Sequence, residues 1–93
     1  MASSDGKVTT LTADGSVFGG PARIMGIYYV ASGTAGSVVI KDGGASGSTV
    51  IDIATPASAT ATSYVDLSAA PVRCGTSAYA DITNVTSISV LYA

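Results

Sequence analysis

Residues 37–52 read SVVIKDGGASGSTVID, two short apolar runs on either side of a pivot of Gly, Ala and Ser. In TVIDI (49–53), Ile51 and Ile53 fall on one face of a strand and Asp52 on the other, the pattern of a strand that buries one face. The runs SVVIK and TVIDI therefore predict two antiparallel strands, and DGGASGS between them predicts a loose hairpin loop, because glycine and Asp tolerate the backbone angles of a reversal.

The same signals recur along the rest of the chain about every 8–12 residues, the spacing of an all-β sandwich or barrel. No segment shows the 3.6-residue apolar period of a helix. The reversal in ITNVT (82–86) is expected to be a tighter one, around Asn84. We expect strands at residues 7–12, 23–31, 37–41, 49–54, 63–67, 78–83 and 86–92, with a further short one at 16–18.

The predicted fold class is all-β: a small antiparallel β-sandwich, either jelly-roll or Ig-like, with about seven to eight strands. Ninety-three residues suffice for one core, so residues 1–93 are expected to form a single domain. Residues 1–6 are interpreted as a flexible N-terminal arm of that domain.

The strand RIMGIYYV (23–30) departs from simple alternation, because apolar residues occupy both of its faces. One interpretation is a bulge at Gly26 that exchanges the two faces halfway along the strand. The other is that one face packs on the core and the opposite face on another subunit, which makes Tyr28 and Tyr29 interface candidates. Both interpretations place this strand at the centre of the fold.

Charged residues make up only 11% of the chain, against about 25% in an ordinary soluble domain. Low charge combined with many strands favours association with defined partners, as in a homo-oligomer or a larger particle. The four cations are dispersed, which argues against nucleic-acid binding. No run of about twenty apolar residues predicts a membrane span, and the N-terminus lacks the pattern of a secretory signal.

The chain lacks the residues that most enzymes use. It has no histidine and no glutamate, and its single cysteine, Cys74, has no imidazole to activate it. The sequence predicts no catalytic residue, no cofactor site and no metal site. Cys74 is interpreted as a small buried side chain, with a thiol bridge between subunits as the alternative.

Two short sequence motifs remain as candidates for an interface. Tyr64-Val65-Asp66 and Tyr79-Ala80-Asp81 repeat the pattern Tyr-x-Asp, which places an aromatic plate beside an acceptor on the outward face of a strand. This arrangement suits a protein interface or a sugar, but it also suits an ordinary exposed strand.

Arg23 and Arg73 each lie two residues after a proline, at the start of a strand. Their side chains suit contacts with a partner's carboxylates, and solubilising surface charge is the alternative.

The block RIMGIYYVASGTAGSVVIKDGGASGSTVIDIATP (23–56) resembles a group of small all-β proteins of tailed phages of aquatic bacteria. The shared features are an Arg-led strand, the segment SGTAGSVVIKDGG and a hydroxyl-rich strand ending in ATP. The C-terminal ITNVTSISVLYA (82–93) is similar to the closing strand of that group.

This resemblance implies a virion structural role, with the chain assembled in the host bacterial cytoplasm. The expected form is a capsid decoration, or cement, protein that binds the major capsid protein or other virion proteins, with a homotrimer as the expected oligomer. The alternatives are a tail, fibre or appendage protein of the virion and a module that recognises glycans or host surfaces.

Overall fold

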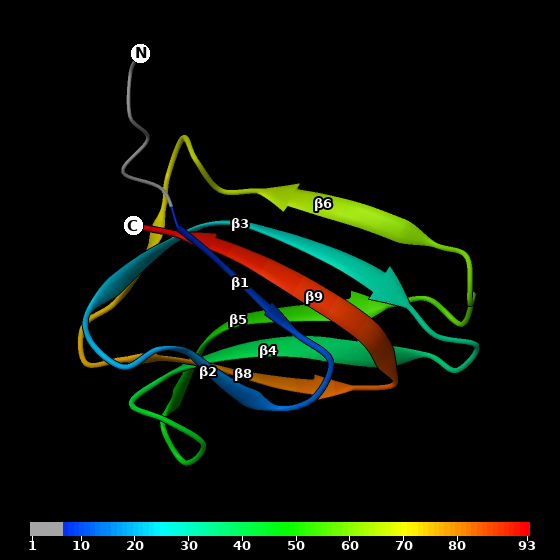
Figure 1. The fold of residues 1–93 in the computed structure, drawn as a ribbon, viewed down its shortest axis with the longest axis horizontal. Coiled ribbons are helices and arrows are strands. Elements are labelled where there is room, and N and C mark those ends of the chain that lie inside the picture. The colour runs from blue at the N-terminus through cyan, green and yellow to red at the C-terminus, as the bar shows by residue number, and fades with distance from the viewer. Residues whose placement is uncertain (1–6) are drawn as a thin grey trace.

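The computed structural model describes residues 7–93, and the predicted arm at residues 1–6 lies outside this range. Within the described range there are nine strands and no helix, and therefore no helix long and apolar enough to cross a membrane (Figure 1). The strands are β1 (Lys7–Leu11), β2 (Gly15–Phe18), β3 (Ala22–Ala31), β4 (Gly36–Asp42), β5 (Ser48–Thr55), β6 (Thr62–Asp66), β7 (Val72–Cys74), β8 (Ala78–Thr83) and β9 (Val85–Tyr92).

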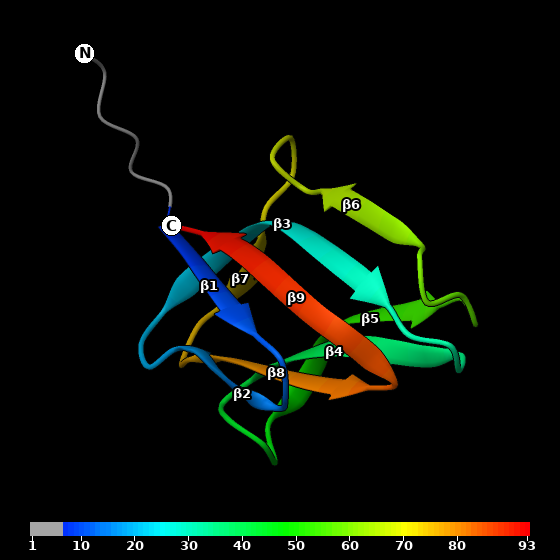
Figure 2. The ribbon, with the colours of Figure 1, turned by 45° about the vertical axis from the view of Figure 1, so that its right-hand side comes forward.

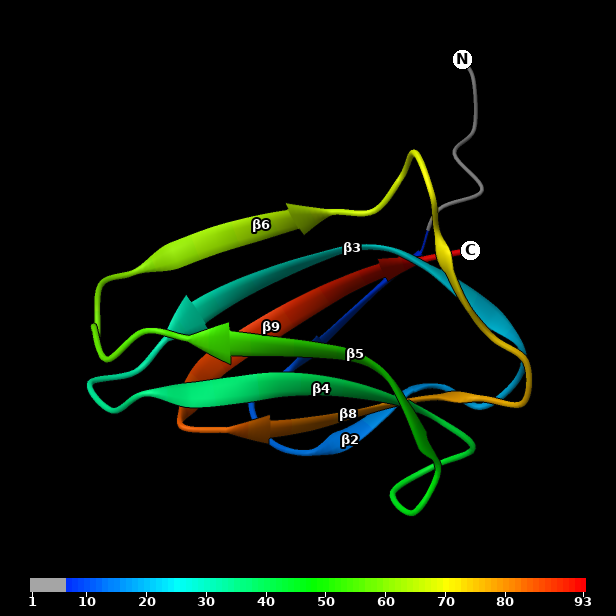
Figure 3. The same ribbon diagram turned by 180° about the vertical axis from the view of Figure 1, so that it is seen from behind.

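The strands form two antiparallel sheets that pack face to face. Sheet I has the order β1-β9-β3-β6, with β7 also paired to β3. Figure 2 shows β1, β9, β3 and β6 next to one another in this order. Sheet II has the order β2-β8-β4-β5 and is seen from behind in Figure 3. The predicted class, a small all-β sandwich, is confirmed.

The strand order identifies the sandwich as a jelly roll. β6 and β7 pair with successive parts of β3, Gly26–Val30 and Ala22–Ile24, so they act as one interrupted edge strand. When they are counted as one, the two sheets have the orders 1-8-3-6 and 2-7-4-5, which is the jelly-roll arrangement and not the Ig-like one.

The hairpin predicted from residues 37–52 is present as β4 and β5. Val38 lies opposite Ile53 and Ile40 opposite Ile51, so these four apolar side chains share the inner face. Gly43 and Gly44 have φ of 106° and 97°, a region that other residues rarely enter, and this reverses the chain within the loop.

The reversal expected at Asn84 is a crossing between sheets and not a hairpin. β8 pairs with β4 in sheet II, whereas β9 pairs with β3 and β1 in sheet I. Asn84 has a φ of 53°, and its Nδ2 donates a hydrogen bond to the carbonyl oxygen of Ala35 at 3.1 Å. Asparagine is among the residues that tolerate this left-handed conformation, which explains its place at the corner.

A bulge in β3 accounts for its apolar residues on two faces. The pairing of β3 with β9 shifts between Ile24 and Gly26, so Met25 is an extra residue in the ladder. Before the bulge Ile24 points inward, and after it Ile27 and Tyr29 do, with Tyr28 exposed. The interpretation of a bulge at Gly26 is confirmed.

The core lies between the two sheets and is made of aliphatic side chains. Its largest fully buried members are Ile24, Ile27, Ile40, Ile88, Val38, Val90 and Cys74. Burial, with a smaller contribution from the charge of Asp42, raises the pKa of the Cys74 thiol. A side chain without exposed surface is not placed to bridge two subunits, so the structure supports Cys74 as a small core residue.

Asp42 ties the β4–β5 hairpin to the loop between β7 and β8. Its carboxylate accepts the backbone N–H groups of Thr76 (2.9 Å), Gly75 (3.0 Å) and Ser77 (3.3 Å). The N–H of Thr76, followed by that of Gly75, holds the pKa of Asp42 below its ordinary value because these bonds favour the charged form.

We therefore expect the protein to lose stability in acid through Asp42. Because the folded pKa lies below the unfolded one, this contribution is complete above about pH 4, the unfolded range for Asp, and is lost as the pH falls through the folded pKa. Urea unfolding curves at several values of pH should show this loss in the native chain and a weaker one in Asp42→Asn. Asp66 provides the comparison, since its pKa is also lowered, by Ser68, and Asp66→Asn should leave the Asp42 contribution in place. Equal pH profiles for the native chain and Asp42→Asn would contradict the assignment.

Candidate functional site

Between residues 7 and 93 no group of three or more His, Cys, Asp or Glu side chains is placed to hold a metal ion. The features that distinguish this molecule are instead the outer faces of its two sheets. The two faces differ in where their charged side chains lie and in how exposed their tyrosines are, and each carries one of the two Tyr-x-Asp pairs.

The middle of the outer face of sheet I has no charged side chain, and the charged residues of this face, Arg23, Arg73 and Asp66, lie toward one end of the sheet. Its register sets Thr10, Ser89, Tyr28 and Tyr64 side by side across β1, β9, β3 and β6. The Thr10 and Ser89 hydroxyls are hydrogen-bonded at 3.0 Å, which confirms that this row shares one face. We call the uncharged part of this surface the tyrosine face; its residues are Val8, Thr10, Gly26, Tyr28, Val30, Thr62, Tyr64, Ser87, Ser89 and Leu91.

Exposed apolar side chains are concentrated on the tyrosine face. Four large hydrophobic residues of the described range are exposed, and three of them lie here: Val8 at 59%, Tyr64 at 48% and Tyr28 at 40%. Tyrosine is enriched in protein interfaces, where its ring gives a large contact area and its hydroxyl keeps a polar end.

Gly26 holds the ring of Tyr64 against the sheet. A Cβ atom built on Gly26 would overlap the hydroxyl and the ring carbons of Tyr64, so the ring lies directly over the glycine backbone. An aromatic ring that covers a glycine on the neighbouring strand is a known device for stabilising a sheet. Tyr64 also lies opposite Tyr28 in the register, so the two tyrosines are neighbours on β6 and β3.

The outer face of sheet II has a different character. Lys41 and Asp81 form an ion pair, with Nζ and Oδ2 3.2 Å apart, and Tyr79 lies opposite Lys41. Asp52 lies on the same face, opposite Val39. This face is therefore charged and its tyrosine is half-buried.

The structure separates the interface candidates predicted from the sequence. Tyr28, Tyr64 and Asp66 lie on the outer side of sheet I, whereas Tyr79 and Asp81 lie on the opposite side of the molecule. The two Tyr-x-Asp pairs are both exposed or half-exposed on outward faces, as predicted, but they do not form one site.

Tyr29 was predicted at an interface, and the structure corrects this. Its side chain is only 8% exposed and belongs to the core, because the bulge at Met25 turns it inward. Val8 and Leu91 also belong to the tyrosine face, although neither was among the predicted interface residues. Their neighbouring position follows from the pairing of β1 with β9, which joins the two ends of the chain and leaves no local signal.

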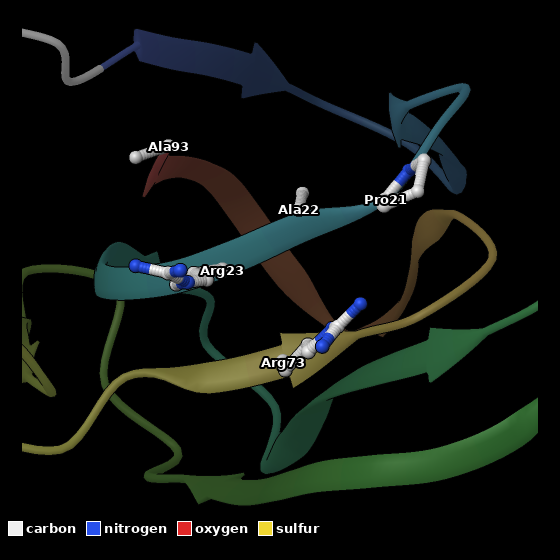
Figure 4. Close-up of a pocket in the computed structure, with 5 residues that line it drawn as sticks. All are labelled: Pro21, Ala22, Arg23, Arg73 and Ala93. Atoms are coloured by element: carbon white, nitrogen blue, oxygen red, sulfur yellow. The ribbon is translucent and has the colours of Figure 1, made fainter.

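Arg23 and Arg73 lie directly opposite each other, on β3 and β7, at one end of sheet I. They line a hollow of about 420 Å³ together with Pro21, Ala22 and Ala93 (Figure 4). The backbone of Arg23 exchanges two hydrogen bonds with Ala93, at 2.9 and 3.0 Å, which holds these two lining residues together. In the described part of the chain neither arginine takes part in an ion pair.

No model of a known protein family matches the chain, and neither a curated protein nor a solved structure matches it. The resemblance to small tailed-phage proteins therefore rests on the residues of 23–56 and 82–93 alone.

Proposed function

We propose that this chain is a structural protein of a phage virion, and specifically a capsid decoration protein that docks its tyrosine face on capsid subunits. The observation that carries the proposal is the contrast between the two outer faces. Sheet II carries the Lys41–Asp81 ion pair in the middle of its outer face, whereas the middle of the outer face of sheet I has no charged side chain and exposes Tyr28, Tyr64 and Val8. Such one-sided exposure of apolar side chains is typical of a surface that binds a protein partner.

Two further observations support a structural role over a chemical one. The residues that resemble tailed-phage proteins, 23–56, form the central strand β3 and the β4–β5 hairpin, which are parts of the scaffold. The jelly roll is a fold that viral capsid proteins use, although lectins and cupins use it as well, so the fold alone does not decide the function.

A decoration protein would act through contact area that is repeated over the shell. Each apolar contact contributes roughly 25 cal/mol per Å² removed from water, so modest contacts at many equivalent positions would strengthen the head. In this proposal the chain binds as a homo-oligomer, with a trimer as the expected form, after assembly of the head in the host cytoplasm.

The geometry is compatible with one of the two alternative functions and argues against one form of the other. A tail, fibre or appendage protein would use the same face in the same way, so only the location in the particle distinguishes it. A sugar site built from both Tyr-x-Asp pairs is not supported, since Tyr64 and Tyr79 lie on opposite sheets and no single saccharide would contact both.

The test is the copy number of the chain in purified particles of the source phage, measured by quantitative mass spectrometry. We expect a copy number of the same order as that of the major capsid protein. A handful of copies would overturn the decoration proposal in favour of a tail or unique vertex. Absence from the particle, with the major capsid protein detected in the same sample, would overturn the virion proposal altogether.

A further inference from the structure

The hollow at the end of sheet I brings together the only two arginines of the chain, which are fifty residues apart in sequence (73 − 23). Like charges directly opposite each other in a sheet destabilise it. Within residues 7–93 neither arginine forms an ion pair, although Asp42 lies close enough to Arg73 for the two charges to interact, so the charges of the two arginines are only partly compensated. An arrangement that costs stability is expected where it serves a ligand.

We infer that Arg23 and Arg73 bind an acidic segment of the partner protein, with one carboxylate for each guanidinium. Arginine suits this role because its planar group donates two parallel hydrogen bonds to a carboxylate. The inference deepens the proposed function, on which it rests for the identity of the partner, because the hollow adjoins the tyrosine face on the same side of sheet I.

The directions of the side chains favour an extended segment over a single small anion. The two Cα atoms of an opposed pair are about 5 Å apart. Figure 4 shows Arg73 reaching toward the side of Pro21 and Arg23 pointing away from it, so the charged ends diverge across the hollow. Two acidic residues separated by one residue on an extended chain lie about 7 Å apart on the same side, which matches two diverging guanidinium groups better than one phosphate does.

A second copy of this chain is a poorer source of the two carboxylates. Asp14, Asp42 and Asp66 accept backbone N–H groups of their own chain. Asp81 is ion-paired, which leaves Asp52 as the one aspartate of residues 7–93 without such a contact. One free carboxylate would leave one arginine of the pair unmatched, so we assign the acidic segment to a different protein of the virion.

The experiment uses the purified chain and a synthetic peptide, Glu-Thr-Glu-Thr, capped at both ends. Because the chain has only two arginines, its NMR spectrum contains only two arginine Nε–H signals, and each reports on one guanidinium. We expect both signals to shift when the peptide is added, and not with the capped peptide Gln-Thr-Gln-Thr at matched ionic strength. Arg23→Gln and Arg73→Gln should each weaken binding by about two- to fivefold, the range for an exposed ion pair. The matched control is Lys41→Gln, which removes the same charge from sheet II and should leave the affinity unchanged.

Three results would overturn the inference. Equal shifts with the glutamine peptide would show that the carboxylates are not recognised. Equal affinity for sodium phosphate would show a general anion site. Shifts that depend on protein concentration without peptide, and that are lost in Asp52→Asn, would assign the contact to a second copy. All of these binding measurements use the isolated chain. A failure to bind the acidic peptide is therefore distinguishable from a low copy number in particles, which would overturn the proposed function alone.

Discussion

Replacing Gly36 with alanine is expected to lower the free energy of unfolding by about 3 kcal/mol, which is a large part of the stability of a domain of this size. Gly36 begins β4, beside the corner where β8 passes into β9. An added Cβ would overlap the backbone carbonyl of Thr83 and come within 2.8 Å of the Cβ of Asn84. Neither obstacle is the free end of a flexible side chain, so the corner between the two sheets would have to move.

Gly33→Ala is the matched control, because Gly33 lies in the loop just before β4 and a Cβ there meets no atom within 4 Å. Its effect should stay within about 0.5 kcal/mol. The measurement is urea unfolding followed by circular dichroism, since the chain has no tryptophan. If both variants unfolded at the same urea concentration, the close approach of β4 to the corner would be wrong.

Replacing Tyr28 with aspartate is expected to remove most of the binding at the tyrosine face. Tyr28 occupies an inner strand of that face, opposite Tyr64 on β6, so it is placed where binding energy concentrates in an interface. Loss of a central tyrosine, with a charge put in its place, should cost about 2 kcal/mol or more of binding, or about thirtyfold in affinity. The monomer should remain folded, because Tyr28 is 40% exposed, although the loss of strand propensity should cost it about 1 kcal/mol.

Light scattering of the purified variant would measure the oligomer, and co-sedimentation with particles stripped of the chain would measure docking. Tyr79→Asp is the control, since it makes the same change on the outer face of sheet II. A Tyr28→Asp variant that did not fold would contradict the exposed position of this residue. Equal losses for Tyr28→Asp and Tyr79→Asp would show that the tyrosine face is not the contact surface.

The strands themselves could be predicted because their signals are local. Each end of an expected strand lies within one residue of the observed end. Examples are β3 (Ala22–Ala31, expected at 23–31) and β5 (Ser48–Thr55, expected at 49–54). Alternation along a strand needs only neighbouring residues, and a glycine-rich loop such as 43–47 marks a reversal without reference to the rest of the chain. The three-residue strand β7 was not among the expected ranges, since so short a segment has no period to detect.

The candidate site could be predicted only in part, for the same reason. Alternation correctly placed Tyr64 and Tyr79 outward, but nothing local separates one Tyr-x-Asp pair from the other, and they belong to opposite sheets. At Tyr29 the simple period was misleading, because a bulge in β3 exchanged the faces, and a bulge depends on how the neighbouring strand pairs.

What the sequence by itself determined is therefore the class of fold, the strands, the β4–β5 hairpin and the two faces of each regular strand. Tertiary structure alone decided which strands share a sheet, that the ring of Tyr64 covers Gly26, and that Arg23 lies opposite Arg73. The physical reason is that side-chain period depends on adjacent residues, whereas strand pairing depends on which distant segments together bury the most apolar surface.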